Sequence, residues 1–168
     1  SIWALAKPVI AQVPGYCLAG GSELATCCDL VYMADDAEMG YPAVRFGVPD
    51  NHFHAWFVGM RKAMEMMLTG DSIDGVEAAR LGWANASFPA DELETRVLEV
   101  ARRIATVPED LVQLNKRVVH RQMEIMGLHT GIRLGSELCA LGTHQKSLHD
   151  FMARVAKQGF HHFWMRRA

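Results

Sequence analysis

The residues best suited to chemistry in this chain lie around a tight turn early in the sequence. A β-branched run ends at Pro14-Gly15, and the pair Gly20-Gly21 then opens a predicted helix that carries Glu23 in its first turn. The first N–H groups of a helix have no partner within it, and they carry a partial positive charge. Because glycine has no side chain, a ligand can approach these groups closely. We therefore predict a site that stabilises a developing oxyanion, with the carboxylate of Glu23 as a proton shuttle.

A structural role for the same residues remains open. A glycine N-cap at Gly20 followed three residues later by Glu23 is typical of a capping box, in which the carboxylate accepts a hydrogen bond from a backbone N–H. The glycine pair does not fit a nucleotide-binding loop. Such a loop needs Gly-Lys-Ser/Thr or Gly-x-Gly-x-x-Gly, and neither pattern occurs in this sequence.

Several motifs along the chain together carry a resemblance to a known family. In chain order they are Lys7-Pro8-Val9-Ile10-Ala11, the run from Gly15 to Ala25, Cys28-Asp29-Leu30, the run from Met64 to Gly70, and Ala78-Ala79-Arg80-Leu81-Gly82-Trp83. With these motifs the chain resembles the crotonase superfamily, that is, the enoyl-CoA hydratase/isomerase family. The resemblance covers the stretch from about residue 7 to about residue 120, in the family's order.

The resemblance implies an α/β fold with two parts. Residues 1–90 would form a partial crotonase-like spiral of ββα repeats that carries the oxyanion-hole turn, and residues 91–168 a C-terminal helical region used for oligomerisation. It implies a homotrimer or hexamer. The implied substrate is an acyl-CoA thioester of fatty-acid or related acyl-CoA metabolism. Coenzyme A is part of that substrate, so no separate cofactor is expected.

The resemblance also assigns roles in the site. In the family, the glycine three residues before the first acid donates one oxyanion-hole N–H, and this position is Gly20. Glu23 would move a proton as a thioester enolate forms, and Ala19, Gly21 and Ala43 would contact substrate. The family's other oxyanion donor comes from an earlier segment, whereas Ser1 enters the family's pattern partway. We expect that donor upstream, in a longer protein or on another chain, unless the protein is naturally short.

The chain departs from the family at the second acid. Two-glutamate hydratases carry it about twenty residues after the first, behind Gly-x-Pro, and here that stretch reads Gly40-Tyr41-Pro42-Ala43. An alanine cannot move a proton, so hydration by the paired-glutamate route is in doubt. Some dienoyl-CoA isomerases of the superfamily carry an aspartate near the position of Asp50, which is our candidate second acid. The plain alternative is that Asp50 belongs to a turn and caps the next helix.

Composition and isolated residues exclude several other functions. A net charge of −2 gives no support to nucleic-acid binding or to an anionic membrane surface. No apolar run reaches the length of a membrane span, and no export signal is visible. His52 and His54 have a ligand-like spacing but lack the further ligands that zinc needs, so no metal is expected. The four cysteines lack Cys-x-x-Cys spacing, and we expect reduced thiols and a cytoplasmic protein.

Periodicity predicts the elements that must position these residues. Strands are expected over 8–13, 30–34, 37–40 and 83–88, and helices over about 21–28 and 52–68. Gly70 suits a left-handed helix end, Ser72 or Asp74 can cap a short helix, and Gly82 can end it. From Asp91 onward the pattern is helical, with helices over about 93–104, 111–126, 132–141 and 147–157.

Two functions of different classes follow from these residues. In the first, the protein is an enoyl-CoA hydratase or isomerase in which Gly20 holds the enolate oxygen and Glu23, with Asp50, moves protons. In the second, the same fold binds acyl-CoA without converting it. Glu23 favours the first function, and Ala43 favours the second. The methionines between Met60 and Met67 either pack in the core or line an acyl tunnel.

Overall fold

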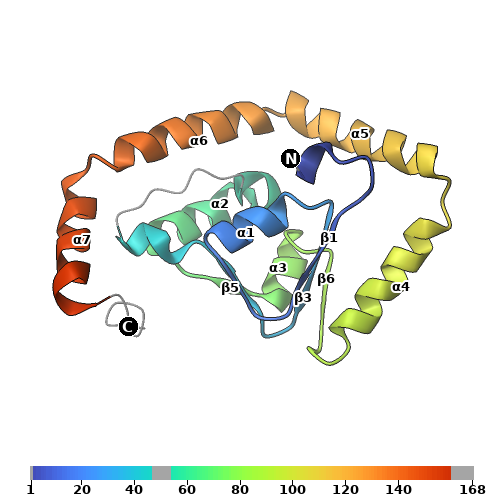
Figure 1. The fold of residues 1–168 in the computed structure, drawn as a ribbon, viewed down its shortest axis with the longest axis horizontal. Helices are drawn as coiled ribbons and strands as arrows, with labels where there is room; N and C mark the ends of the chain where they lie inside the picture. Colours follow the sequence, from blue (N-terminus) through green and yellow to red (C-terminus); the bar gives the residue numbers. More distant parts are fainter. Residues whose placement is uncertain (1, 47–53, 160–168) are drawn as a thin grey trace.

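A computed structural model describes residues 2–46 and 54–159, and in these residues two small sheets form the centre of the molecule (Figure 1). The first sheet is parallel throughout and has the order β1-β3-β6, with bounds β1 (Ile10–Val13), β3 (Leu30–Ala34) and β6 (Ala86–Phe88). The second sheet has the order β2-β4-β5, with bounds β2 (Tyr16–Leu18), β4 (Glu38–Gly40) and β5 (Ile73–Asp74). In it β2 and β4 run parallel, and β5 runs antiparallel to β4.

Helices cover and extend this centre. Their bounds are α1 (Gly20–Thr26), α2 (His54–Thr69), α3 (Gly75–Leu81), α4 (Leu93–Ala105), α5 (Glu109–Ile125), α6 (Leu128–Gly142) and α7 (Lys146–Gln158), with 3-10 turns η1 (Ile2–Ala4) and η2 (Pro42–Phe46). The expected α/β class, with a helical C-terminal region, is confirmed. The division into a 1–90 and a 91–168 domain stays a prediction.

The local signals place most helix ends correctly. Gly70 and Gly82 both have positive φ angles, 72° and 88°, as left-handed helix ends require. Asp74 rather than Ser72 caps α3, because its Oδ1 accepts a hydrogen bond from the Glu77 N–H at 2.8 Å. One feature was not predicted: α2 is interrupted at Gly59, where φ is 74° and ψ is 160°.

The core lies between the two sheets and the helices packed on them. Met33 of β3 and Met39 of β4 are completely buried. Gly75 begins α3 so close to β3 that a Cβ atom at this position would lie 2.0 Å from the Ala34 carbonyl oxygen. Only glycine allows that approach of helix to strand. The close packing fixes β3 and its neighbours, and therefore the strand ends that carry the site.

The last four helices, α4 to α7, form an arc around the centre (Figure 1). Helix α4 packs on all three strands of the parallel sheet, whereas α5 packs mainly on α6, and α7 approaches η2. Large apolar side chains on α5 and α6 stay more than two-fifths exposed, including Leu111, Leu114, Val118, Val119, Ile125, Leu134, Leu138 and Leu141. None of the helices in the described ranges is long and apolar enough to cross a membrane.

The methionines of α2 divide between the two expected environments. Met66 is 1% exposed and belongs to the core, and Met67 packs against it. Met60 and Met64 are 60% and 52% exposed, so the core interpretation is wrong for these two. They lie one turn apart on the outer face of the helix.

Candidate active site

The predicted oxyanion turn lies where β2 passes into α1. Leu18 of β2 pairs with Gly40 of β4, and the Ala19 N–H donates to the Gly40 carbonyl at 2.8 Å. Because parallel strands end at the same edge of a sheet, the turn lies beside the residues that follow Gly40. These are the residues of the altered Gly-x-Pro motif, which ends at Ala43. The structure therefore brings the turn and the second-acid position to one edge.

Ala19 has a strained backbone at the centre of the turn. Its φ is 50° and its ψ is −121°, and it is the one non-glycine residue with positive φ in the described part of the chain. Such conformations cost roughly 1–3 kcal/mol and cluster at functional sites. Ala19 is also the N-cap of α1, so the expected glycine N-cap at Gly20 is wrong by one residue. A short apolar strand gave no signal in the sequence that the chain would reverse at an alanine.

Replacing Ala19 with Gly should relieve this strain. Glycine adopts positive φ without steric cost, although its greater freedom in the unfolded chain cancels part of the gain. We expect the free energy of unfolding to rise by about 1 kcal/mol, as measured by urea denaturation. The matched control is Ala25→Gly, in the interior of α1, which should lower it by a similar amount. A loss of stability in Ala19→Gly would contradict the strained turn.

The first amide groups of α1 face open space. Gly20 and Gly21 are both exposed. A Cβ atom at Gly20 would meet no heavy atom within 4 Å, and one at Gly21 would meet only the Cys17 sulfur at 3.9 Å. Within the described residues the Gly20 N–H has no hydrogen-bond acceptor. The N–H is therefore available to an oxygen atom from outside the chain, as an oxyanion donor must be.

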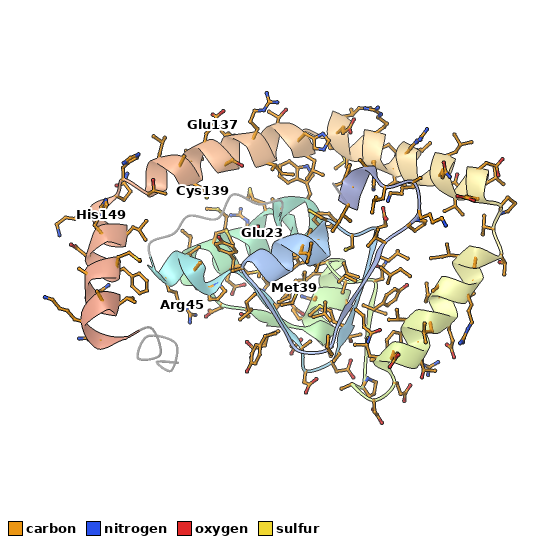
Figure 2. The ribbon with its side chains drawn as sticks, viewed as in Figure 1. Glu23, Met39, Arg45, Glu137, Cys139 and His149 are labelled. Atoms are coloured by element: carbon orange, nitrogen blue, oxygen red, sulfur yellow. The ribbon has the colours of Figure 1, made fainter. Side chains whose placement is uncertain are left out.

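Glu23 lies on the same short helix and is half-buried. It is the fourth helical residue, and its N–H donates to the Ala19 carbonyl at 3.1 Å. A capping box requires a carboxylate at the third position that accepts from the N–H of the N-cap residue. The Ala19 N–H instead donates to Gly40, so the capping-box interpretation is wrong. Residues three apart on a helix are neighbours, which places Glu23 and Gly20 on the same side of α1 (Figure 2).

Buried hydrogen bonds hold the inner side of α1. The Ser22 hydroxyl donates to the Ala19 carbonyl at 2.8 Å, and the Thr26 hydroxyl donates to the Ser22 carbonyl at 2.6 Å. The indole N–H of Trp83 donates to Thr26 Oγ1 at 2.8 Å. Ser22 and Thr26 are 1% and 4% exposed. The chain of bonds runs from the strained turn to the loop after α3 and fixes the helix that carries Glu23.

The candidate second acids give no carboxylate in the described part of the site. Ala43 is half-buried in η2. Asp50 and His52 lie outside the described residues, and His54 begins α2 with a side chain that is not described. The charged residue of η2 is Arg45, which donates to the Thr69 carbonyl at 2.7 Å and forms an ion pair with Asp71. These bonds fasten η2 to the end of α2.

The thiols near α1 are poor nucleophiles. Burial raises the pKa of Cys17 to about 11, and burial also raises the pKa values of Cys27 and Cys28. The thiolate is the reactive form, and at neutral pH these thiols stay protonated. Within the described ranges, no group of three His, Cys, Asp or Glu side chains could hold a metal ion. The chemistry available at this turn is therefore that of amide donors and a carboxylate.

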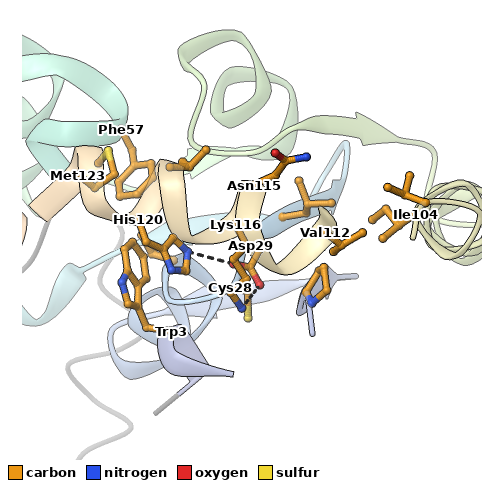
Figure 3. Close-up of a pocket in the computed structure, with 15 residues that line it drawn as sticks. Trp3, Cys28, Asp29, Phe57, Ile104, Val112, Asn115, Lys116, His120 and Met123 are labelled. Carbon is orange, nitrogen blue, oxygen red and sulfur yellow. Dashed lines mark hydrogen bonds and ion pairs between the residues drawn. The ribbon is translucent and has the colours of Figure 1, made fainter. Parts of the chain in front are cut away.

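A cavity of about 440 Å³ lies at the other end of α1 (Figure 3). Gly20 and Glu23 do not line it. Its wall is mostly apolar and includes Phe57 and Met123, and its polar part is formed by Asp29 and Lys116. Sequence reasoning quoted the motif that contains Asp29 but did not select its carboxylate, because its partners come from a helix far along the chain.

Comparisons with known proteins agree on one family. A family model described as Enoyl-CoA hydratase/isomerase matches residues 1–165. The chain is 40% identical over 131 residues to the Mycobacterium tuberculosis protein named "Putative enoyl-CoA hydratase EchA13", which covers 76% of this chain and 41% of that protein. It is 35% identical over 127 residues to the crotonyl-CoA hydratase of Syntrophomonas wolfei, covering 73% of this chain and 49% of that protein.

A solved structure shows the same fold. The crystal structure of an enoyl-CoA hydratase from Mycobacterium smegmatis matches with a TM-score of 0.90 at 30% identity, over 96% of this chain and 56% of that chain. The expected crotonase-like fold is confirmed by this match. The chain spans about half the length of the curated relatives it matches.

Proposed function

Because the chain belongs to the enoyl-CoA hydratase/isomerase family, we propose that it acts on an acyl-CoA thioester through an oxyanion-stabilised enolate. The observation that carries the proposal is the turn from β2 to α1, where the Gly20 N–H is open and Glu23 lies one turn away on the same helix. An enolate oxygen gathers negative charge, which an amide donor at the start of a helix stabilises.

The proposed chemistry is a proton transfer at the carbon next to the thioester carbonyl. Hydration adds a proton at this carbon, and a double-bond shift removes one from it, so Glu23 serves either reaction as acid or base. The Gly20 N–H hydrogen-bonds the thioester oxygen, and the charge on that oxygen grows as the enolate forms. Ala19 and Gly21 flank this donor and contact the thioester group.

Turnover of two substrates tests the proposal. The protein, expressed from its whole reading frame, is offered crotonyl-CoA to measure hydration and a 3-enoyl-CoA to measure isomerisation. Conversion of either substrate that depends on Glu23 supports catalysis. Binding of both thioesters with no conversion supports the alternative function, a non-catalytic acyl-CoA-binding protein of the same fold. Ala43 is the observation that favours this alternative, because it removes the second carboxylate.

Restoring a carboxylate at position 43 should raise hydration. In Ala43→Glu, the new side chain extends from η2 at the sheet edge that carries the oxyanion turn, and a positioned general acid or base accelerates proton transfer by roughly 10²–10⁴-fold. Since the surrounding residues did not evolve to orient it, we expect only about a tenfold rise in kcat for crotonyl-CoA hydration. Ala43→Gln, of nearly the same shape, is the control and should show no rise. Equal rates in the two variants would exclude position 43 from proton transfer.

We also propose assembly as a homotrimer or hexamer through the C-terminal helices. The apolar side chains exposed on α5 and α6 support this proposal, since monomeric proteins rarely expose large apolar surfaces. Sedimentation equilibrium measures the assembly directly, and a monomer at micromolar concentration would contradict it. A cytoplasmic location and a role in fatty-acid or related acyl-CoA metabolism complete the proposal. The four unpaired cysteines support the location, because reducing compartments keep thiols free.

A further inference from the structure

A buried cluster of charged side chains fastens the segment after α1 to the distant helix α5 (Figure 3). The Asp29 carboxylate accepts hydrogen bonds from the Val9 N–H at 2.7 Å and from Lys116 Nζ at 2.7 Å. Its second oxygen lies 3.1 Å from His120 Nε2. Lys116 Nζ also donates to the Lys7 carbonyl at 3.2 Å. The cluster therefore joins three segments: the entry to β1, the turn between α1 and β3, and α5.

The cluster is shielded from water. The side chains of Lys116, Asp29 and His120 are 7%, 14% and 15% exposed. The Trp3 ring stacks on His120 with a centroid distance of 3.9 Å and covers it. Two opposite charges in such surroundings attract strongly, but each becomes a buried, uncompensated charge if its partner is removed. The Asp29–Lys116 pair is therefore a rigid connection, unlike the exposed ion pairs elsewhere on the helices.

The connection reaches the candidate site through the two turns of α1. Asp29 follows the end of α1 by three residues, and its N–H donates to the Val9 carbonyl at 2.9 Å. Glu23 lies one turn before the helix end, and the Cys27 N–H donates to its carbonyl at 3.0 Å. Movement of the turn at Asp29 would therefore move the backbone of Glu23, because a short hydrogen-bonded helix moves as a unit.

We propose that Asp29 and Lys116 are positioning residues for the reaction, which hold α1 so that Glu23 and the Gly20 N–H meet the substrate together. This inference rests on the proposed function. Displacement of a reacting group by about 1 Å can lower a rate by roughly 10²-fold. The pair thus makes the site in the sheet region depend on a side chain of α5, 87 positions further along the chain.

A double-mutant cycle separates positioning from charge balance. Asp29→Asn and Lys116→Met each leave one buried charge without its partner, so both single variants should lose stability and turnover. The double variant has no uncompensated charge and should recover most of the stability to urea. It still lacks the Lys116 hydrogen bonds to the turn, so kcat should stay about 10- to 100-fold below wild type, with KM within about threefold. Recovery of kcat together with stability would overturn the proposal.

Amide hydrogen exchange gives a readout that needs no turnover. In the double variant, the N–H groups of Glu23 and Cys27 should exchange at least about tenfold faster than in wild type, because α1 opens more often. The control is Lys146→Met with Asp150→Asn, an exposed ion pair on α7 that should change neither exchange nor kcat. If the wild-type protein converts no thioester, the proposed function fails while the exchange rates still test the positioning. Unchanged exchange at both amides in the double variant would overturn it.

Discussion

The Glu23→Gln variant is expected to lose at least about 10²-fold in kcat on any thioester that the protein converts. Glutamine has nearly the same shape as glutamate but cannot accept or return a proton at neutral pH. Glu23 is half-buried on α1, near the open Gly20 amide, so the substitution removes proton transfer while the oxyanion donor stays in place. KM should change little, because the thioester oxygen keeps its hydrogen bond.

Two measurements make this result specific to Glu23. Glu94→Gln removes an exposed carboxylate from the first turn of α4 and should leave kcat unchanged. Urea denaturation of Glu23→Gln should give a stability close to that of wild type, which excludes unfolding as the cause. Turnover that survives in Glu23→Gln would mean that another group moves the proton. It would contradict the role proposed for Glu23.

The Gly20→Pro variant should lose about 10²- to 10³-fold in kcat, since removal of one oxyanion donor has an effect of this size in other enzymes. Proline has no N–H, so the variant deletes the donor itself. Gly20 is the first residue of α1, a position where proline is well tolerated because its N–H makes no bond within the helix. The fold should therefore survive the substitution, and the effect should appear in catalysis.

Gly20→Ala is the matched control for this donor. A Cβ atom at this position meets no heavy atom of the protein within 4 Å, and alanine keeps the N–H. We expect less than about a tenfold loss of kcat/KM in this variant, from contact of the new methyl group with substrate. Circular dichroism and urea denaturation of both variants should match wild type. Equal kcat values for the proline and alanine variants would contradict a donor role for the Gly20 amide.

The helices of this protein could be predicted because their signals are local. The three-four spacing of apolar residues after Asp91 predicted α4 to α7, and glycine and aspartate marked the ends of α2 and α3. The two strands that were not predicted, β2 and β5, have only three and two residues, too few to show a period. Their pairing with β4 comes from the surrounding fold.

The candidate site divides in the same way. The types and spacing of Gly20 and Glu23 indicated an amide donor and a carboxylate on one short helix. The exact start of that helix was not predictable, because Ala19 adopts a positive φ that its sequence context does not favour. This conformation is held from outside the turn, by the hydrogen bond between the Ala19 N–H and the Gly40 carbonyl.

The sequence by itself determined which residues form helices, which family's motifs are present, and that an alanine stands at the position of the second acid. These properties depend on residue type and on neighbours within a turn or two. Only the tertiary structure decided that Ala19 caps α1 and that Asp29 meets Lys116. Such contacts join residues that are far apart in the chain, and they form only when burial of the apolar core brings those segments together.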